Sequence, residues 1–151
     1  MKAEERIKEL GITLPETAPP RAMYVPVKRT GNLLYVSGQL PMRQDGTILK
    51  GKIGKERSIE HGQEAARLCA ISILAALKIE LGDLDLIKNF VKLQVFVNCE
   101  PDFSEPHIVA NGASQLLYDV FGEPGRHART TIGTVQLPLD TSVEVEAIVE
   151  I

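Results

Sequence analysis

Three cationic side chains gather in the segment GEPGRHARTT, residues 122–131, and the chain has no other cluster of this kind. Arg126 and His127 precede a run that reads as a β-strand, and Arg129 stands at its entrance. A guanidinium group in that place can bind a carboxylate through two parallel hydrogen bonds, which a lysine ammonium cannot do as well. The hydroxyl groups of Thr130 and Thr131 follow and can donate further hydrogen bonds. We therefore predict that this segment binds an anion, held by Arg129.

Simpler interpretations of these cations remain open. Arg129 could instead form a surface ion pair with Glu123 or Glu150. Arg126 and His127 are interpreted as loop residues at the rim of the site, where they would tune its charge or its choice of substrate.

The other reactive side chains form no catalytic or metal-binding pattern. His61, His107 and His127 are scattered, and neither Cys69 nor Cys99 stands beside a histidine at a strand end or helix start. No set of histidine, cysteine and carboxylate residues has the spacing of a zinc site, and no phosphate-binding glycine loop occurs. We expect reduced thiols, no metal ion and no nucleophilic triad.

The elements that must position these residues follow from hydrophobic periodicity, prolines and glycines. Ser58 is a good N-cap for a helix that is apolar almost all round from Ala65 to Leu81, which predicts burial against a sheet and against another helix. The other predicted elements are a short helix (3–10), a proline-containing linker (12–22), a hairpin (23–28 and 32–40), a loop (41–57), a strand (86–98), a helix (106–121) and a second hairpin (129–137 and 142–151).

Alternation along the strands separates two faces of the predicted sheet. On one face lie Val143, Val145, Ala147, Val149 and Ile151, with Val91, Leu93, Val95 and Val97. On the other lie Glu144, Glu146, Ile148 and Glu150, with Lys92, Gln94 and Phe96. The apolar face would take the two helices. The mixed face is typical of a subunit interface, although a hydrated face fits nearly as well and would by itself explain the paired glutamates.

Composition and charge limit the class of protein. With 151 residues, 44% hydrophobic and 25% charged, the chain is predicted to form a single domain over residues 1–151. A net charge of −3 offers no broad basic surface, so no nucleic-acid partner is expected. No signal-peptide pattern and no bilayer-spanning apolar run occur, so a cytoplasmic protein without membrane contact is expected.

Three segments resemble a known family. YVPV…GNLLYVSGQLP (24–41), NFVKLQVFVN…PDF (89–103) and HARTTIGTVQLPLDTSVEVEAI (127–148) are similar to RidA/YjgF-type proteins, also labelled "endoribonuclease L-PSP". The resemblance covers about residues 20–151, with residues 1–20 as an N-terminal helix and linker extension. It implies a chorismate-mutase-like α+β fold, a mixed sheet with two helices on one face, and a homotrimer with ligand clefts between subunits.

The activity that the resemblance implies is hydrolysis of reactive 2-imino (enamine) acids to 2-oxo acids and ammonia, without a cofactor. Carried over by motif, Arg129 would bind the substrate carboxylate and Glu144 would hold or activate water. Tyr24 matches the tyrosine of the cleft, although the surrounding RAMYVPV differs from the usual family pattern.

The resemblance also implies the residues that line the cleft. Ser37 and Gly38 match its SGQ segment, and Thr131 stands where the family often has cysteine. Asn111 and Ser114 both remain candidates for the position of a helix asparagine. A non-catalytic module that binds a small carboxylate in the same cleft is the alternative function, and a ribonuclease is disfavoured by the acidic balance.

The predicted second hairpin has a consequence for the site. It would place Glu144 beside Val135, six residues along from Arg129, which is roughly 20 Å away. Arg129 and Glu144 of one chain should then not meet, and we expect a composite site that takes one residue from each of two subunits.

Overall fold

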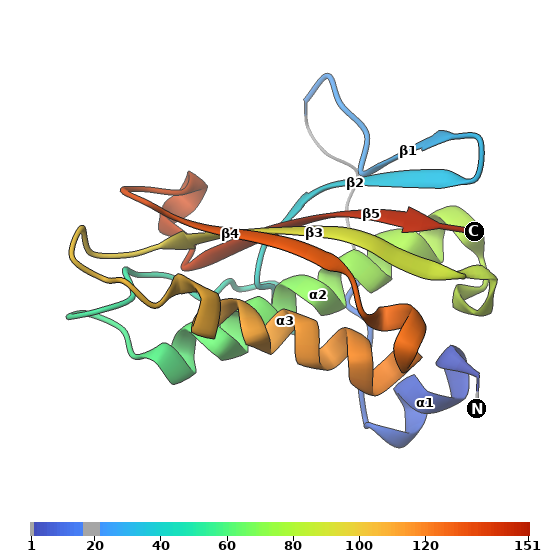
Figure 1. Cartoon of the computed structure of the whole chain (residues 1–151), viewed down its shortest axis with the longest axis horizontal. Coiled ribbons are helices and arrows are strands. Elements are labelled where there is room, and N and C mark those ends of the chain that lie inside the picture. Colours follow the sequence, from blue (N-terminus) through green and yellow to red (C-terminus); the bar gives the residue numbers. More distant parts are fainter. Residues whose placement is uncertain (1, 17–21) are drawn as a thin grey trace.

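Five strands form one mixed sheet, and two long helices cover one of its faces (Figure 1). The computed structural model describes residues 2–16 and 22–151. In spatial order the strands are β1 (Val27–Thr30), β2 (Leu33–Gln39), β5 (Val143–Glu150), β3 (Asn89–Asn98) and β4 (Ala128–Thr134). The helices are α1 (Ala3–Glu9), α2 (Ile59–Leu81) and α3 (Pro106–Phe121). The α+β class and the two helices on one face of the sheet are confirmed.

The long helix α2 begins and ends where local signals predict. Ser58 accepts a hydrogen bond from the backbone N–H of His61 at 3.1 Å, and Gly82 ends the helix in the left-handed conformation, with φ 75°. Between them the helix is buried from Ala65 to Leu77 apart from Arg67 and Leu68, because it packs against both the sheet and α3.

The two long helices approach each other closely at Gly112. A Cβ atom on this residue would lie 2.0 Å from the backbone oxygen of Gln63 in α2, so no side chain fits. The contact sets the position of α3 beside α2 and hence determines which residues of α3 face β4.

The predicted second hairpin is wrong, because β3 lies between β4 and β5. At the edge of the sheet β4 runs parallel to β3, with Arg129 beside Leu93. On the other side β5 runs antiparallel to β3, with Glu144 beside Phe96. The connection from β4 to β5 contains the 3₁₀ turn η3 (Pro138–Asp140) and crosses the end of β3 instead of turning back on β4.

The fully buried Asn98, the last residue of β3, holds this crossing connection. Its Nδ2 atom lies 3.0 Å from Gln136 Oε1 and 3.1 Å from both Asp140 Oδ1 and the backbone oxygen of Thr141. Its Oδ1 atom accepts a hydrogen bond from Lys52 Nζ at 2.8 Å. The segment PLDT has local turn chemistry, but these non-local bonds decide its path.

Two strand assignments also need correction. β1 begins at Val27 and not at Met23, so Tyr24 precedes the strand. In β3 the register shifts between Phe90 and Lys92, which turns Phe90 into the core and leaves Val91 41% exposed. The simple alternation places Val91 on the core face, and this prediction is wrong because of the shift in register.

The remaining alternation is confirmed. The valines of β5 at positions 143, 145 and 149 are buried beneath the helices. The opposite face, here called the open face, carries Glu144, Glu146 and Ile148 beside Lys92, Gln94 and Phe96, and no described helix covers it (Figure 1). Within the described residues, no helix is long and apolar enough to cross a membrane. The predicted short N-terminal helix is confirmed as α1, and residues 17–21 of the predicted linker lie outside the described residues.

Candidate functional site

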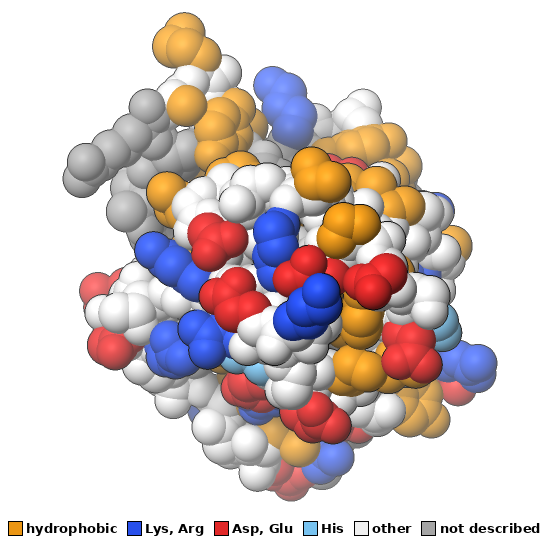
Figure 2. Space-filling view, turned by 90° about the vertical axis from the view of Figure 1, so that its left-hand side faces the viewer, with side chains coloured by type: hydrophobic (Ala, Val, Ile, Leu, Met, Phe, Trp, Pro, Cys, Tyr) orange, Lys and Arg blue, Asp and Glu red, His pale blue; other side chains and the backbone are white. Residues whose placement is uncertain are grey.

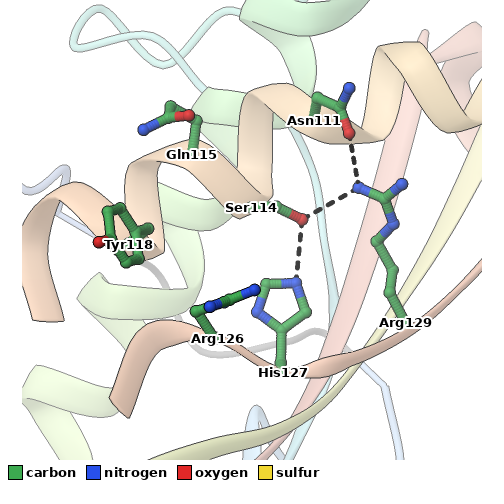
Figure 3. A pocket seen from close by; sticks show the side chains of 7 residues that line it. All are labelled: Asn111, Ser114, Gln115, Tyr118, Arg126, His127 and Arg129. Carbon is green, nitrogen blue, oxygen red and sulfur yellow. Dashed lines mark hydrogen bonds between the residues drawn. The ribbon is translucent and has the colours of Figure 1, made fainter. Parts of the chain in front are cut away.

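Arg129 points from the edge strand β4 toward α3, where three oxygen atoms hold its guanidinium group (Figure 3). Nη1 donates to Asn111 Oδ1 at 2.9 Å and to Ser114 Oγ at 3.1 Å. Nη2 donates to the backbone oxygen of His107 at 3.2 Å. Both helix residues that compete for the family's asparagine position therefore contact Arg129.

The predicted alternative of a surface ion pair for Arg129 is wrong. Glu123 pairs with Arg126, 3.5 Å away at the surface. Glu150 accepts hydrogen bonds from Asn32 and Asn89. Neither carboxylate is bonded to Arg129.

The bonds to α3 leave one edge of the guanidinium group available. A guanidinium has five N–H donors, and the three bonds to Asn111, Ser114 and His107 account for both hydrogens of Nη1 and one of Nη2. The Nε hydrogen and one hydrogen on Nη2 have no acceptor among the described residues. These two nitrogens can together bind a carboxylate in bidentate fashion. Burial lowers the pKa of Arg129 from its usual value, and a guanidinium stays protonated regardless.

His127 belongs to the same cluster, contrary to its interpretation as a rim residue. Its Nε2 atom lies 2.9 Å from Ser114 Oγ, and its Nδ1 atom lies 2.7 Å from the backbone oxygen of Gly125 (Figure 3). Burial lowers the pKa of His127, and the nearby Arg129 charge lowers it further, although the Gly125 carbonyl opposes the shift. His127 is therefore neutral at neutral pH. No sequence signal separates it from a surface histidine, because its side-chain partner, Ser114, comes from α3.

A cavity of about 590 Å³ opens beside this cluster. Figure 3 shows the seven side chains that line it: Asn111, Ser114, Gln115, Tyr118, Arg126, His127 and Arg129. None of them is a carboxylate, and two are arginines, so the cavity favours an anion.

Thr131 lies two residues beyond Arg129 in β4, on the same side of the sheet. Its Oγ1 atom is buried and has no hydrogen-bond partner among the described residues. A buried hydroxyl without a partner is costly, so Thr131 is a suitable donor or acceptor for a group that enters beside Arg129.

A second cluster lies on the open face, around Glu144. Its carboxyl group lies over Gly38 of β2, so close that a Cβ atom at position 38 would be 2.2 Å from Oε1. Burial raises the pKa of Glu144, and the neighbouring Glu146 raises it further. Ser37 donates to the backbone oxygen of Val25 at 2.7 Å, which ties the segment before β1 to β2. Tyr24, adjacent to Val25, is 59% exposed.

The two clusters are separate within one chain. Between Arg129 and Glu144 lies the whole of β3, with the two residues beside Leu93 and Phe96 of that strand. This corresponds to about 10 Å along the strands and about 10 Å across them. Arg129 faces α3, whereas Glu144 is on the open face. The predicted separation is therefore present, but it results from the inserted strand and not from a hairpin.

His61 and the two cysteines form no second reactive cluster among the described residues. His61 Nε2 lies 2.9 Å from Ser142 Oγ. Cys69 and Cys99 are buried and free, and burial raises the pKa of each thiol, so neither is a reactive thiolate. The described part of the chain contains no group of three or more potential metal ligands.

Comparison with known proteins assigns the family. The model of the YjgF/chorismate-mutase-like endoribonuclease family matches residues 4–151, a stretch that includes most of α1. Protein TCP17 of Trypanosoma cruzi is 47% identical over 146 residues, which cover 96% of this chain and 91% of that protein. A solved structure from Shewanella oneidensis MR-1 is 32% identical, with a TM-score of 0.95 over 100% of both chains.

A second solved structure, of an Agrobacterium tumefaciens protein of unknown function, is 52% identical with a TM-score of 0.91. It covers 99% of this chain and 93% of that one. The family match and the 47% identity to TCP17 confirm the resemblance to RidA/YjgF-type proteins, and the chain belongs to the YjgF/chorismate-mutase-like endoribonuclease family.

Proposed function

We propose that this protein hydrolyses reactive 2-imino acids to 2-oxo acids and ammonia, without a cofactor, in clefts between the subunits of a homotrimer. The observation that carries the proposal is the available Nε–Nη2 edge of Arg129, which the Asn111, Ser114 and His107 contacts hold in place. A 2-imino acid carries a planar carboxylate next to its reactive carbon. Binding that carboxylate at Arg129 would therefore orient the imine.

The chemistry needs one proton acceptor. The imine carbon is electrophilic, so a water molecule adds to it and forms a carbinolamine. The C–N bond then breaks, ammonia leaves, and the 2-oxo acid remains. Glu144 would take a proton from the adding water and deliver it to the imine nitrogen. It would then take the proton of the new hydroxyl group and deliver it to the same nitrogen as the C–N bond breaks, which leaves the 2-oxo group and ammonia. A carboxyl group with a raised pKa is suited to both proton transfers.

In the proposed trimer, a neighbouring subunit supplies the Glu144 carboxylate that the Arg129 cluster of a single chain lacks. Because Arg129 and Glu144 lie on opposite faces of the sheet, a common ligand would require Glu144 from a neighbouring subunit. The open face offers apolar area for such an assembly, including Tyr35 and Ile132, which are 46% and 43% exposed.

Turnover by Arg129 variants tests the proposal. A threonine dehydratase generates 2-iminobutyrate, and semicarbazide traps whatever imine is left. We expect wild type to remove the imine and Arg129→Lys to lose at least about tenfold in rate, because an ammonium group cannot bind the carboxylate at two points. Arg67→Lys, the same change in a half-buried residue of α2 that is paired with Glu64, should keep the rate. An inactive wild type, or full activity in Arg129→Lys, would refute imine hydrolysis.

One observation favours a second candidate, a non-catalytic module that binds small carboxylates. The Arg129 cluster is complete within one chain and does not need Glu144 to hold an anion. Calorimetry that detects binding of 2-oxobutyrate, together with absence of imine turnover, would support this candidate.

The surface does not favour the ribonuclease named in the family description. At the end of the molecule shown in Figure 2, Lys and Arg side chains alternate with Asp and Glu, and the described side chains there form no single basic patch. Together with the net charge of −3, this gives little attraction for a phosphate backbone.

A further inference from the structure

We propose that His127 is a positioning residue that sets the direction of the Ser114 hydroxyl and thereby the orientation of the Arg129 guanidinium. We further propose that it couples carboxylate binding at Arg129 to the uptake of one proton. The coupling rests on the proposed role of Arg129, whereas the positioning role rests on hydrogen bonds within the chain alone.

The bonds of His127 define its tautomer. Nδ1 lies 2.7 Å from the backbone oxygen of Gly125, and a carbonyl can only accept, so Nδ1 carries the hydrogen. In the neutral ring Nε2 then has only a lone pair, and it lies 2.9 Å from Ser114 Oγ. The Ser114 hydroxyl must therefore donate to Nε2.

This assignment makes Ser114 an acceptor toward Arg129. A serine has a single hydroxyl hydrogen, and here it is given to His127, so Ser114 Oγ can only accept from Arg129 Nη1, 3.1 Å away. The hydrogen bonds thus run in one direction, from Arg129 through Ser114 and His127 to Gly125. Without His127 the hydroxyl could turn, and one of the three supports of the guanidinium would weaken.

The anchor of this chain of bonds is itself fixed in position. Gly125 lies against the backbone of α3, where an added Cβ atom would be 2.2 Å from the oxygen of Leu117. Because α3 also carries Ser114, the acceptor for Nδ1 and the donor for Nε2 are held by the same helix. Both hydrogen-bond partners of His127 are therefore fixed relative to α3.

Protonation would reverse one of these bonds. A proton can add only at Nε2, which then donates to Ser114 Oγ, and the serine hydrogen is released toward the cavity. The resulting imidazolium lies close to the Arg129 guanidinium, and the two like charges repel. An anion bound at Arg129 offsets that repulsion, so binding favours proton uptake, and by linkage protonation strengthens binding by the same factor.

The other charged and ionisable groups that face His127 do not account for the proposed proton uptake. Arg129 on β4 and Arg126 next to the ring remain cationic throughout the relevant range, and Glu123 pairs with Arg126 at the surface. Tyr118 of α3 is the other ionisable side chain among the residues that line the cavity beside His127. In the proposed trimer Glu144 of a neighbouring subunit would also titrate, so variants are compared at the same pH.

The positioning role is tested without any ligand. Long-range ¹H–¹⁵N correlation spectra report which ring nitrogen carries the hydrogen, and His127→Gln identifies the His127 signals by their loss. At about pH 8 we expect a protonated Nδ1 and an unprotonated Nε2. The opposite tautomer would overturn the positioning role.

The coupling is tested by calorimetry with 2-oxobutyrate at about pH 8 and about pH 5.5. Wild type should bind on the order of three- to tenfold more tightly at the lower pH. In His127→Gln the side-chain Oε1 can still accept from Ser114 but does not titrate, so this enhancement should be lost and the affinity at the higher pH kept. His127→Ala, which offers Ser114 no acceptor, should bind roughly fivefold more weakly at the higher pH.

The matched control is His61→Gln, which changes an imidazole that contacts Ser142 and makes no bond to the Arg129 cluster, so it should keep the pH dependence. Equal pH dependence in wild type and His127→Gln would overturn the coupling. If 2-oxobutyrate does not bind wild type at either pH, the proposed function and the coupling fail together, and the ring-nitrogen spectra alone then decide the positioning role.

Discussion

At the scale of single residues, the carboxyl group of Glu144 occupies the space that a side chain at position 38 would need. In Gly38→Ala the new Cβ atom would lie 2.2 Å from Oε1. Because that oxygen is the end of a flexible side chain, the carboxyl group must move while the strand stays. We expect nearly unchanged stability in urea and a loss of imine turnover of at least about tenfold. Full turnover in this variant would argue against a role for Glu144.

The raised pKa of Glu144 also predicts how stability depends on pH. Burial and the nearby Glu146 disfavour the ionised form of Glu144 in the folded chain. The free-energy cost of ionising Glu144 in the folded state is therefore absent well below its ordinary pKa of 4.5, where the group is protonated, and is complete above its raised pKa. Stability attributable to this group should therefore fall as pH rises between those two values. Glu144→Gln should be more stable than wild type at neutral pH, and the difference should vanish at acidic pH. Urea denaturation of both proteins across this range measures the effect, and a constant difference would contradict it.

How far the site could be predicted depends on the distance between its parts in the sequence. Arg129 is recognisable because a cation at a strand entrance is a local pattern. Its supports on α3 are 15 to 22 residues away, and only the packing of α3 against β4 shows that Asn111 and Ser114 both contact it. His127 has no local signature at all, since burial and a carbonyl partner make it different from an exposed histidine.

At the scale of elements, the carboxylate of Glu4 helps to attach α1 to the rest of the fold, beside the buried Ile7 and a hydrogen bond from Arg6 Nε to the backbone oxygen of Asp119. Glu4 Oε1 accepts hydrogen bonds from the backbone N–H of Leu84 at 3.0 Å and from Lys78 Nζ at 2.5 Å. Burial tends to raise the pKa of Glu4, but these two donors outweigh it and the pKa is lowered. This contact of α1 therefore depends on the ionised carboxylate of Glu4.

Removal of this carboxylate should loosen α1. Glu4→Ala is expected to lower the free energy of unfolding by about 1 kcal/mol, because the pair is partly exposed and its bonds are partly replaced by water. Glu9→Ala removes the same charge from an exposed pair with Arg6 on the same helix and should have almost no effect. Urea denaturation at equal protein concentration compares the two variants. An equal loss of unfolding free energy in the two variants would mean that Glu4 does not stabilise the attachment of α1.

Elements with local signals were predictable, whereas the strand order was not. Ser58 and Gly82 mark the ends of α2 in the sequence itself. By contrast, nothing near PLDT shows that β3 separates β4 from β5, because the decisive contacts come from Asn98, about 40 residues earlier. The bulge that exposes Val91 is likewise a property of pairing with β5 and not of β3 alone.

At the scale of the whole molecule, the sheet has one face closed by helices and one left open. Alternation in β5 predicts both faces correctly, because period-two patterns survive any change of strand order. It does not say what covers the open face. A proposed trimer would cover that face and would bring Arg129 of one subunit toward Glu144 of the next.

Mixing two inactive variants tests whether the cleft is composite. In a trimer with cyclic symmetry, Arg129→Ala subunits retain Glu144, and Glu144→Gln subunits retain Arg129. Neither variant alone has an intact cleft. After denaturation together in equal amounts and refolding, a random assembly has about one quarter of its clefts intact, because each cleft needs the right subunit on both sides. We expect about one quarter of wild-type imine turnover in the refolded mixture and almost none in either variant treated alone. If the mixture is as inactive as its components, although mixed trimers are detected by mass spectrometry, Arg129 and Glu144 do not serve a shared cleft.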